Sequence, residues 1–186
     1  MRIVAGELRG RAIQAPLGQD VRPTSDRARQ AVFNILEHAS WSPGIEGSRA
    51  MDVFAGSGAL GLEALSRGAA ACLFVELAGA SLEAIRANIA SFGLEGRGRL
   101  LRQDATRLGR RPEAEAPYPL VFLDPPYAKG LADPALQALR AGGWLAAEAV
   151  VALEQGAADP APSLDGFDQL DQRRYGVARV TFLRPG

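Results

Sequence analysis

Hydrophobic residues recur along this chain with two different periods. Between residues 26 and 39 they return every three or four positions, which predicts an amphipathic helix, and Thr24 or Ser25 can cap its first turn. Arg27 and Asn34 fall outside the apolar stripe of this helix, so we expect both side chains on its polar face. The stripe consists of Ala28, Ala31, Val32, Ile35, Leu36 and Ala39.

From residue 49 onward, short apolar runs alternate with segments of helical period. Strands joined through helices form right-handed crossovers, and these build a parallel sheet with helices on both faces. Two more strand-like segments, 167–175 and 177–183, surround Gly176 and predict a closing antiparallel hairpin. The pattern therefore predicts an α/β fold, a doubly wound sheet of seven strands with an antiparallel last strand. We expect the other strands at residues 49–54, 71–76, 99–102, 120–124 and 150–154, and helices at residues 59–67, 81–92 and 133–140.

The first 48 residues precede the alternating pattern and form a unit of a different kind. Residues 2–5 and 11–13 are short alternating segments, and Gly6 and Gly10 supply turns between them. A length of 186 residues suits one α/β domain and leaves little room for a second. We therefore expect a β-hairpin and helix extension at residues 1–48, attached to a main domain at residues 49–186.

A glycine-rich loop follows the first strand of the main domain. The sequence Asp52-Val53-Phe54-Ala55-Gly56-Ser57-Gly58 ends a strand and opens a helix, where backbone N–H groups can bind a ligand. Glu76 ends the next strand, 20 residues after Gly56, and suits the hydroxyl groups of a ribose. These features fit a nucleoside cofactor, whether a dinucleotide or S-adenosylmethionine.

The acid Asp52 favours S-adenosylmethionine. A carboxylate just before the loop would repel a pyrophosphate, whereas it attracts the ammonium group of the methionyl moiety. Asp104 follows the third strand and is placed to accept a hydrogen bond from the adenine amino group. A glycine-rich turn that binds nothing is the alternative, and acids at three successive strand ends argue against it. We predict a cofactor site formed by Asp52, Phe54, Ala55, Gly56, Gly58, Glu76, Leu77, Asp104 and Ala105, with Thr24 contributed by the N-terminal unit.

The tetrapeptide Asp124-Pro125-Pro126-Tyr127 follows the fourth strand, at the edge where parallel sheets bind ligands. Its two prolines lack N–H donors and stiffen the loop. Asp124 and the Pro125 carbonyl can then accept the two hydrogens of a planar exocyclic amine, which orients the nitrogen and stabilises its developing positive charge. Tyr127 offers a ring on which a flipped base can stack. We predict that these four residues form the catalytic site of an amino-group methyltransferase; a proline turn with a capping aspartate is the simpler alternative.

Composition argues against several other classes of protein. One cysteine, Cys72, excludes an internal disulfide and a cysteine cluster, and one histidine, His38, argues against a histidine-rich metal site. No apolar run reaches the roughly 18 residues of a membrane span. We therefore expect a cytoplasmic protein with no metal and no membrane partner.

Charge is unevenly distributed, although the formal net charge is zero. Residues 1–30 hold six arginines against three acids, and residues 97–111 hold six arginines against one acid. Arginine suits bidentate phosphate contacts and stacking on bases, so both segments are candidates for contact with a nucleic acid. Solvated surface is the alternative for each arginine.

With these residues in view, the chain resembles the bacterial 16S rRNA guanine-N2 methyltransferases that modify position 966. The resemblance runs nearly end to end. The Asp-Pro-Pro-Tyr motif is shared with DNA adenine methylases, so the N-terminal Arg-Pro-Thr segment is the more discriminating part. The similar segments are Arg2–Gly6, Arg9–Arg11, Arg22-Pro23-Thr24-x-Asp26-Arg27-x-Arg29, Phe33-Asn34, Asp52–Gly68, Asp124–Tyr127 and Gly143-Trp144-Leu145.

The resemblance implies transfer of a methyl group from S-adenosylmethionine to the N2 amine of one guanine in 16S rRNA. Asp124–Tyr127 would hold the guanine. One departure is Ala78, which stands where the family often has a second acid two residues after Glu76. A zero net charge gives weak non-specific affinity for phosphate, so we expect the protein to act on rRNA within a 30S subunit or assembly intermediate. We also expect a monomer. Contacts to the RNA substrate would come from Arg9, Arg11, Arg22, Arg27, Arg29 and Asn34.

Three other functions stay open at the level of the sequence. One is N6-adenine methylation of DNA or RNA, which on duplex DNA would ordinarily need a target-recognition domain that 186 residues do not accommodate. Another is an oxidoreductase on a dinucleotide-binding fold, which Asp52 and the Asp-Pro-Pro-Tyr motif disfavour. The third is a non-catalytic rRNA assembly factor that retains the fold.

Overall fold

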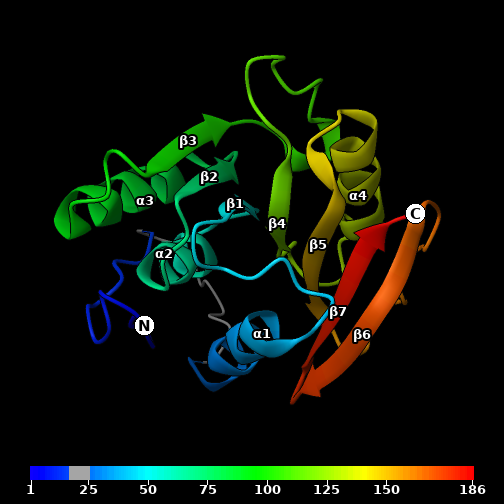
Figure 1. The fold of residues 1–186 in the computed structure, drawn as a ribbon, viewed down its shortest axis with the longest axis horizontal. Coiled ribbons are helices and arrows are strands. Elements are labelled where there is room, and N and C mark those ends of the chain that lie inside the picture. The colour runs from blue at the N-terminus through cyan, green and yellow to red at the C-terminus, as the bar shows by residue number, and fades with distance from the viewer. Residues whose placement is uncertain (17–25) are drawn as a thin grey trace.

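A computed structural model describes residues 1–16 and 26–186 of the chain. The strands of this part form one seven-stranded sheet in the order β3-β2-β1-β4-β5-β7-β6 (Figure 1). The order reverses between β1 and β4, as in doubly wound folds, where ligands bind at such a switch point. The strands are β1 (Arg49–Val53), β2 (Ala71–Glu76), β3 (Gly98–Arg102), β4 (Tyr118–Leu123), β5 (Leu145–Gly156), β6 (Phe167–Tyr175) and β7 (Ala178–Pro185).

Strand directions confirm the predicted mixed sheet. β1 pairs in parallel with β2 and with β4, and parallel pairing continues to β3 on one side and to β5 on the other. β7 runs antiparallel to both β5 and β6, so the last two strands form the predicted closing hairpin. This hairpin forms one edge of the sheet in Figure 1, while the central strands lie between helices.

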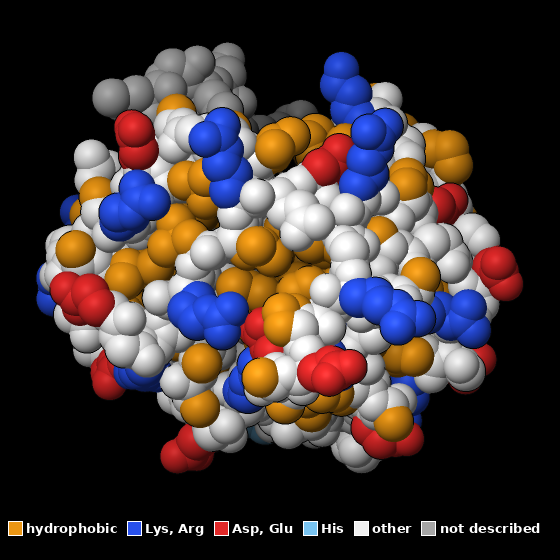
Figure 2. Space-filling view, turned by 90° about the horizontal axis from the view of Figure 1, so that it is seen from above, with side chains coloured by type: hydrophobic (Ala, Val, Ile, Leu, Met, Phe, Trp, Pro, Cys, Tyr) orange, Lys and Arg blue, Asp and Glu red, His pale blue; other side chains and the backbone are white. Residues whose placement is uncertain are grey.

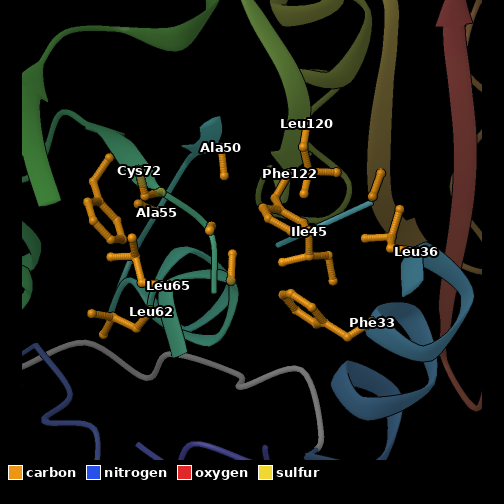
Figure 3. Packing of buried hydrophobic residues seen from close by; sticks show 14 of the residues in the cluster. Phe33, Leu36, Ile45, Ala50, Ala55, Leu62, Leu65, Cys72, Leu120 and Phe122 are labelled. Atoms are coloured by element: carbon orange, nitrogen blue, oxygen red, sulfur yellow. The ribbon is translucent and has the colours of Figure 1, made fainter. Parts of the chain in front are cut away.

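Helices cover both faces of the sheet, and each face has its own hydrophobic core. Alternate residues of every central strand point to opposite faces, as strand geometry requires. Even-numbered residues such as Phe122 pack with α1 (Asp26–His38), α2 (Ala59–Ser66) and α3 (Gly79–Phe92). Odd-numbered residues such as Leu123 pack with α4 (Ala132–Ala141) and the short 3-10 helix η1 (Ala105–Arg107). Figure 3 shows the first core, where Phe33 of α1 lies near Phe122 with ring centroids 5.1 Å apart.

The N-terminal extension packs into that first core instead of forming one of its own. Its hairpin is short: Arg2 bridges Ala12, and Ile3 N donates to Arg11 O at 2.9 Å. Ile3 and Ile13 are buried in the same cluster as residues of the sheet. Residues 1–48 are therefore part of one folding unit with the sheet, as far as the structure describes them.

A buried ionic network fixes this extension to α2. Both Glu63 and Arg29 have no exposed surface, and Arg29 Nε lies 3.5 Å from Glu63 Oε2. Glu63 also accepts hydrogen bonds from Val4 N at 2.8 Å, Ala5 N at 3.0 Å and Arg67 Nε at 2.9 Å. A buried carboxylate needs this number of donors to offset the loss of water. The start of the chain is thereby fastened to the helix that follows the glycine loop.

Element boundaries differ from the predicted ones mainly at β5 and η1. β5 begins at Leu145, five residues before the predicted strand. The prediction missed this start because the residues after Leu145 are alanines and Glu148, which have low strand propensity. Pairing with Tyr118 extends the strand there through a register shift. η1 was not predicted, since three residues carry no periodic signal.

Over the described ranges, no helix is both long and apolar enough to cross a membrane.

Candidate active site

Asp52 of β1 holds the glycine loop between β1 and α2 in place. Its Oδ2 accepts a hydrogen bond from Gly61 N at 2.8 Å, in the first turn of α2. Gly58, the N-cap residue of α2, adopts φ 78° and supplies no side-chain cap. Asp52 therefore does the work of a cap from the neighbouring strand, and its negative charge lies at the helix N-terminus, where it is favourable.

Burial gives the Asp52 carboxyl an unusual affinity for a proton. Only 1% of the residue is exposed. Loss of solvation raises its pKa from 3.8 to about 7; the Gly61 N–H opposes the shift, and the Glu76 carboxylate adds to it. The sequence predicted that Asp52 contacts the methionyl ammonium group. In this conformation the side chain offers almost no surface for direct contact, so its immediate task is to hold the loop.

Glu76 at the end of β2 holds the other side of the loop. Its Oε2 accepts from Gly56 N at 2.9 Å, and its Oε1 accepts from Leu77 N at 2.8 Å and Ala78 N at 2.9 Å. Gly56 and Glu76 are 20 residues apart in the sequence, and the fold brings them into direct contact. Leu77 is 55% exposed, an unusual state for leucine, and offers an apolar surface next to the carboxylate.

Close packing explains the glycine in the first turn of α2, and backbone conformation explains those in the loop before it. A Cβ at Gly61 would lie 2.3 Å from the Phe74 ring and 2.7 Å from Cys72 Sγ, which leaves no room for any side chain. Gly56 and Gly58 both have positive φ, and so does Phe54, at 61°. Positive φ is costly for an aromatic residue, and such strain collects at binding sites where the surrounding structure enforces it. The conformation of the loop is therefore fixed by packing and by its backbone angles.

Asp104 and Ala105 follow β3 at the same edge of the sheet. Asp104 Oδ1 accepts from Thr106 N at 2.9 Å and Thr106 Oγ1 at 2.7 Å, so it caps η1. These hydrogen bonds lower the pKa of Asp104, with a smaller contribution from the Arg107 charge. Ala105 is buried. The predicted cofactor residues from Asp52 to Ala105 thus follow three adjacent strands, while Thr24 lies outside the described residues.

The Asp124–Tyr127 tetrapeptide leaves the sheet beside this loop. Asp124 N donates to Val53 O at 3.2 Å, which joins the two segments. Burial raises the pKa of Asp124 well above its usual range, and the charges of Glu154 and Asp52 add to the effect. Asp124 is therefore a carboxyl group with a strong affinity for protons at the junction of the two predicted sites.

Tyr127 is anchored at its hydroxyl group and also through the next residue. Its hydroxyl donates to Glu154 Oε1 at 2.6 Å. The next residue, Ala128, has φ 58°, and its N–H donates to the two Asp159 carboxylate oxygens at 3.2 and 3.3 Å. Side chain and backbone are thus fixed by separate acids, Glu154 from β5 and Asp159 from the loop after it.

Glu154 was missed as a site residue by the sequence analysis, although the sequence does contain a signal. The run Leu120–Leu123 is followed by Asp124, and the run Val150–Leu153 is followed by Glu154. The two runs pair in parallel through Leu123 and Leu153, so the acids come next to each other. A second acid after the next apolar run could have been recognised as part of the same site.

A hollow of about 500 Å³ adjoins the tetrapeptide on the side of α4. Its lining is mostly proline, alanine and glycine from the tetrapeptide, the start of α4 and residues 158–161. Its polar lining residues already have partners in the protein: Asp133 accepts from Ser163 N at 2.8 Å, and Asp159 accepts from Gly156 N at 3.0 Å. The hollow thus widens the site beyond Asp124.

The predicted RNA-contacting residues fall into three groups. Arg9, Arg27 and Asn34 are exposed. Arg11 is exposed as well, and its guanidinium donates to Ser91 O at 2.7 Å and lies 5.1 Å from the Phe92 ring centroid. Arg22, like Thr24, lies outside the described residues.

Arg29 requires a correction. It is fully buried, it pairs with Asp26 at 2.9 Å and with Glu63, and its Nη2 donates to Arg2 O. A side chain without exposed surface makes no contact with RNA, so Arg29 is structural in this conformation. It was predicted as an RNA contact from the arginine-rich first 30 residues and from the family resemblance, neither of which reveals the buried partner Glu63.

One face of the molecule combines positive charge with apolar surface. Figure 2 shows Lys and Arg side chains surrounding a central area of exposed hydrophobic side chains. Within the described residues, no group of three or more His, Cys, Asp and Glu is arranged to hold a metal ion.

Comparison with known proteins places this geometry in a family. A family model matches residues 1–184. The chain belongs to the family described as conserved hypothetical protein 95. A curated relative, ribosomal RNA small subunit methyltransferase D of Escherichia coli K12, is 38% identical over 154 residues, which cover 83% of this chain and 74% of the relative. A putative rRNA methyltransferase of Bacillus subtilis is 37% identical over a match that covers 68% of this chain and 67% of that protein.

Solved structures agree with this family membership. A putative methyltransferase from Escherichia coli superposes with a TM-score of 0.80 at 32% identity, over 100% of this chain and 97% of that one. The fold is that of the class I methyltransferases, with the mixed seven-stranded sheet and antiparallel last strands expected from the sequence.

Proposed function

We propose that this protein transfers a methyl group from S-adenosylmethionine to the exocyclic N2 amine of a guanine in 16S rRNA, at position 966 by its resemblance. One observation carries the proposal. The proline-rich acceptor loop and the glycine loop are joined at neighbouring strand ends, through Asp124 N and Val53 O. An amine bound at Asp124 would then lie beside a cofactor bound at the glycine loop.

The glycine loop fits S-adenosylmethionine on the grounds of its own chemistry. Gly56 and Gly58 have positive φ and carry no side chain, so the loop presents bare backbone at these two positions. Glu76 supplies a carboxylate suited to ribose hydroxyl groups, and the exposed Leu77 supplies an apolar surface against which a base could pack. When bound there, the cofactor would supply an electrophilic methyl group on a sulfonium ion.

The acceptor loop would orient the amine and handle its proton. Asp124 and the Pro125 carbonyl accept the two N–H groups, which directs the nitrogen lone pair toward the glycine loop. As the nitrogen gains positive charge, the Asp124 carboxylate stabilises it. A carboxylate with a raised pKa is also a better proton acceptor near neutral pH, so Asp124 suits the removal of the departing proton.

The RNA substrate is supported by the relatives and by the surface. The curated relatives carry the names of rRNA methyltransferases. Exposed Arg9 and Arg27 lie on the N-terminal extension, where positive charge would meet phosphate groups. Because the net charge of the chain is zero, we expect an assembled particle to be a better substrate than free RNA.

A methylation assay tests this proposal. The purified protein is incubated with labelled S-adenosylmethionine and with 30S subunits from cells that lack the modification, free 16S rRNA or duplex DNA. Nucleoside mass spectrometry then identifies the product. We expect N2-methylguanosine, formed faster in 30S particles than in free RNA. N6-methyladenine would overturn the proposed acceptor, and no transfer to any substrate would favour a binding role without catalysis.

A further inference from the structure

The ends of β4 and β5 place two carboxyl groups side by side. Leu123 pairs with Leu153 as the last matched pair of these parallel strands, and each is followed by an acid. Asp124 and Glu154 therefore follow paired residues on neighbouring strands, whose backbones lie about 5 Å apart. Glu154 is 6% exposed, an unusual state for a glutamate that must be offset by specific partners.

One of those partners is the hydroxyl group of Tyr127. The O–H donates to Glu154 Oε1 at 2.6 Å, the length typical of a hydrogen bond to a carboxylate. This bond ties the end of the Tyr127 ring to β5, a strand in the middle of the sheet. The bond consequently fixes the position of the hydroxyl end of the ring.

We propose that Glu154 is a positioning residue for methyl transfer, which holds the Tyr127 ring through its hydroxyl group and places a second carboxyl group beside Asp124. This inference rests on the proposed function and names a residue that the acceptor motif does not contain. Glu154 acts through Tyr127 and Asp124.

The charges around Asp124 explain how Glu154 would act on it. Glu154 on β5 and Asp52 on β1 are the charged groups that act on Asp124 from the strands beside it, and both are acidic. Burial and these charges raise the pKa of Asp124. Removing the Glu154 charge should lower that pKa, since less negative charge opposes ionisation.

Two variants separate the two roles of Glu154. Glu154→Gln keeps an oxygen that can accept from the Tyr127 hydroxyl but removes the charge. Tyr127→Phe keeps the charge and the ring but removes the hydroxyl group. Glu148→Gln is the matched control, because Glu148 lies on the same strand with its side chain 80% exposed and pairs with Arg184.

The experiment measures kcat against pH on the 30S substrate, and the titration of the Asp124 carboxyl carbon by NMR in the ligand-free protein. If ionised Asp124 is the active form, kcat rises with pH through its pKa. For Glu154→Gln we expect both the NMR midpoint and the acidic limb of kcat to move to lower pH by about half a unit or more. For Tyr127→Phe we expect a roughly fivefold to tenfold lower kcat, equivalent to one lost hydrogen bond. The acidic limb of its pH profile should stay at the same pH.

The result that would overturn the inference is equally definite. If Glu154→Gln and Tyr127→Phe both keep the kcat and the pH profile of Glu148→Gln, Glu154 has no positioning role. The same holds if Glu154→Gln lowers only the melting temperature, since a structural role alone would leave the Asp124 titration unmoved. If the unaltered protein transfers no methyl group while the NMR midpoint still shifts, the proposed function fails and the coupling of the two carboxyl groups stands.

Discussion

Acidic side chains at the strand ends are used differently in the two halves of the sheet. On the β1–β2 side, Asp52 and Glu76 accept hydrogen bonds from backbone N–H groups and so shape the glycine loop. On the β4–β5 side, Asp124 and Glu154 lie next to each other, and Glu154 accepts a hydrogen bond from the side chain of Tyr127. The first pair fixes backbone, whereas the second pair concentrates negative charge where an amine would develop positive charge.

The largest expected difference between the halves is in the rate of methyl transfer. Asp124→Asn removes the charge that would stabilise the amine, so we expect kcat to fall about 10²- to 10³-fold. Asp52→Asn keeps an oxygen for the Gly61 N–H and should lower kcat less than tenfold. Calorimetry with S-adenosylhomocysteine serves as the control, because Asp124→Asn should still bind it. Equal losses of kcat in the two variants would show that the acids of the two halves do not differ in their contribution to methyl transfer.

A second difference concerns stability against pH. The folded state raises the pKa of Asp52 from 3.8 to about 7, so it binds a proton more tightly than the unfolded chain does. The free energy of unfolding should therefore fall as pH rises between these values, by about 2 to 3 kcal/mol from pH 5 to pH 7 for one such group. Asp124 contributes in the same direction.

Urea unfolding at pH 5, 6 and 7 measures this slope. Asp52→Asn should make this slope shallower, since the amide does not titrate while Asp124 still does. A protein that becomes more stable over this range would show that the strand-end carboxyls are not the dominant titrating groups.

A third, smaller effect is expected in cofactor affinity. Glu76→Gln replaces one carboxylate oxygen with an N–H₂ group, which leaves fewer acceptors for Gly56, Leu77 and Ala78. We expect the affinity for S-adenosylhomocysteine to fall about tenfold, or about 1.4 kcal/mol. Glu83→Gln on the exposed side of α3 is the matched control and should bind as the unaltered protein does. Unchanged binding by Glu76→Gln would place the ribose elsewhere.

The smallest effect should come from the loop that supports Ala128. Asp159→Ala removes the acceptor of the Ala128 and Gly156 N–H groups and relaxes the positive φ after Tyr127. We expect the activation free energy of methyl transfer to rise by about 1 kcal/mol, which corresponds to a roughly fivefold lower kcat. Asp165→Ala, an exposed acid farther along the same loop, should have no effect. Should both variants be equally active, the tyrosine would be fixed by Glu154 alone.

Much of the fold could be predicted because its signals are periodic and local. The alternation of strand and helix, and Gly176 between two strand-like segments, led to the seven-stranded sheet with its hairpin. β2 and β6 have the predicted boundaries, 71–76 and 167–175. The start of β5 could not be predicted, because alanine-rich residues joined the sheet through pairing with β4 and not through their own propensity.

The site could be predicted only where a single segment carries it. The glycine loop and the Asp-Pro-Pro-Tyr motif are contiguous, so spacing was enough to place both at strand ends. Glu154 depends on the register between two strands, and the burial of Arg29 depends on Glu63, 34 residues away in the sequence. Such relations exist only once the chain has folded.

The network around Glu63 has a consequence for how such enzymes could be altered by recombination. Glu63 accepts N–H groups from Val4 and Ala5, pairs with Arg29, and lies on the helix whose first turn Asp52 caps. A chain cut at residue 49 would leave this glutamate buried with Arg67 as its remaining partner from the network. The extension is thus not an exchangeable module. A chimera that imports another protein's N-terminal segment would have to import its helix α2 as well.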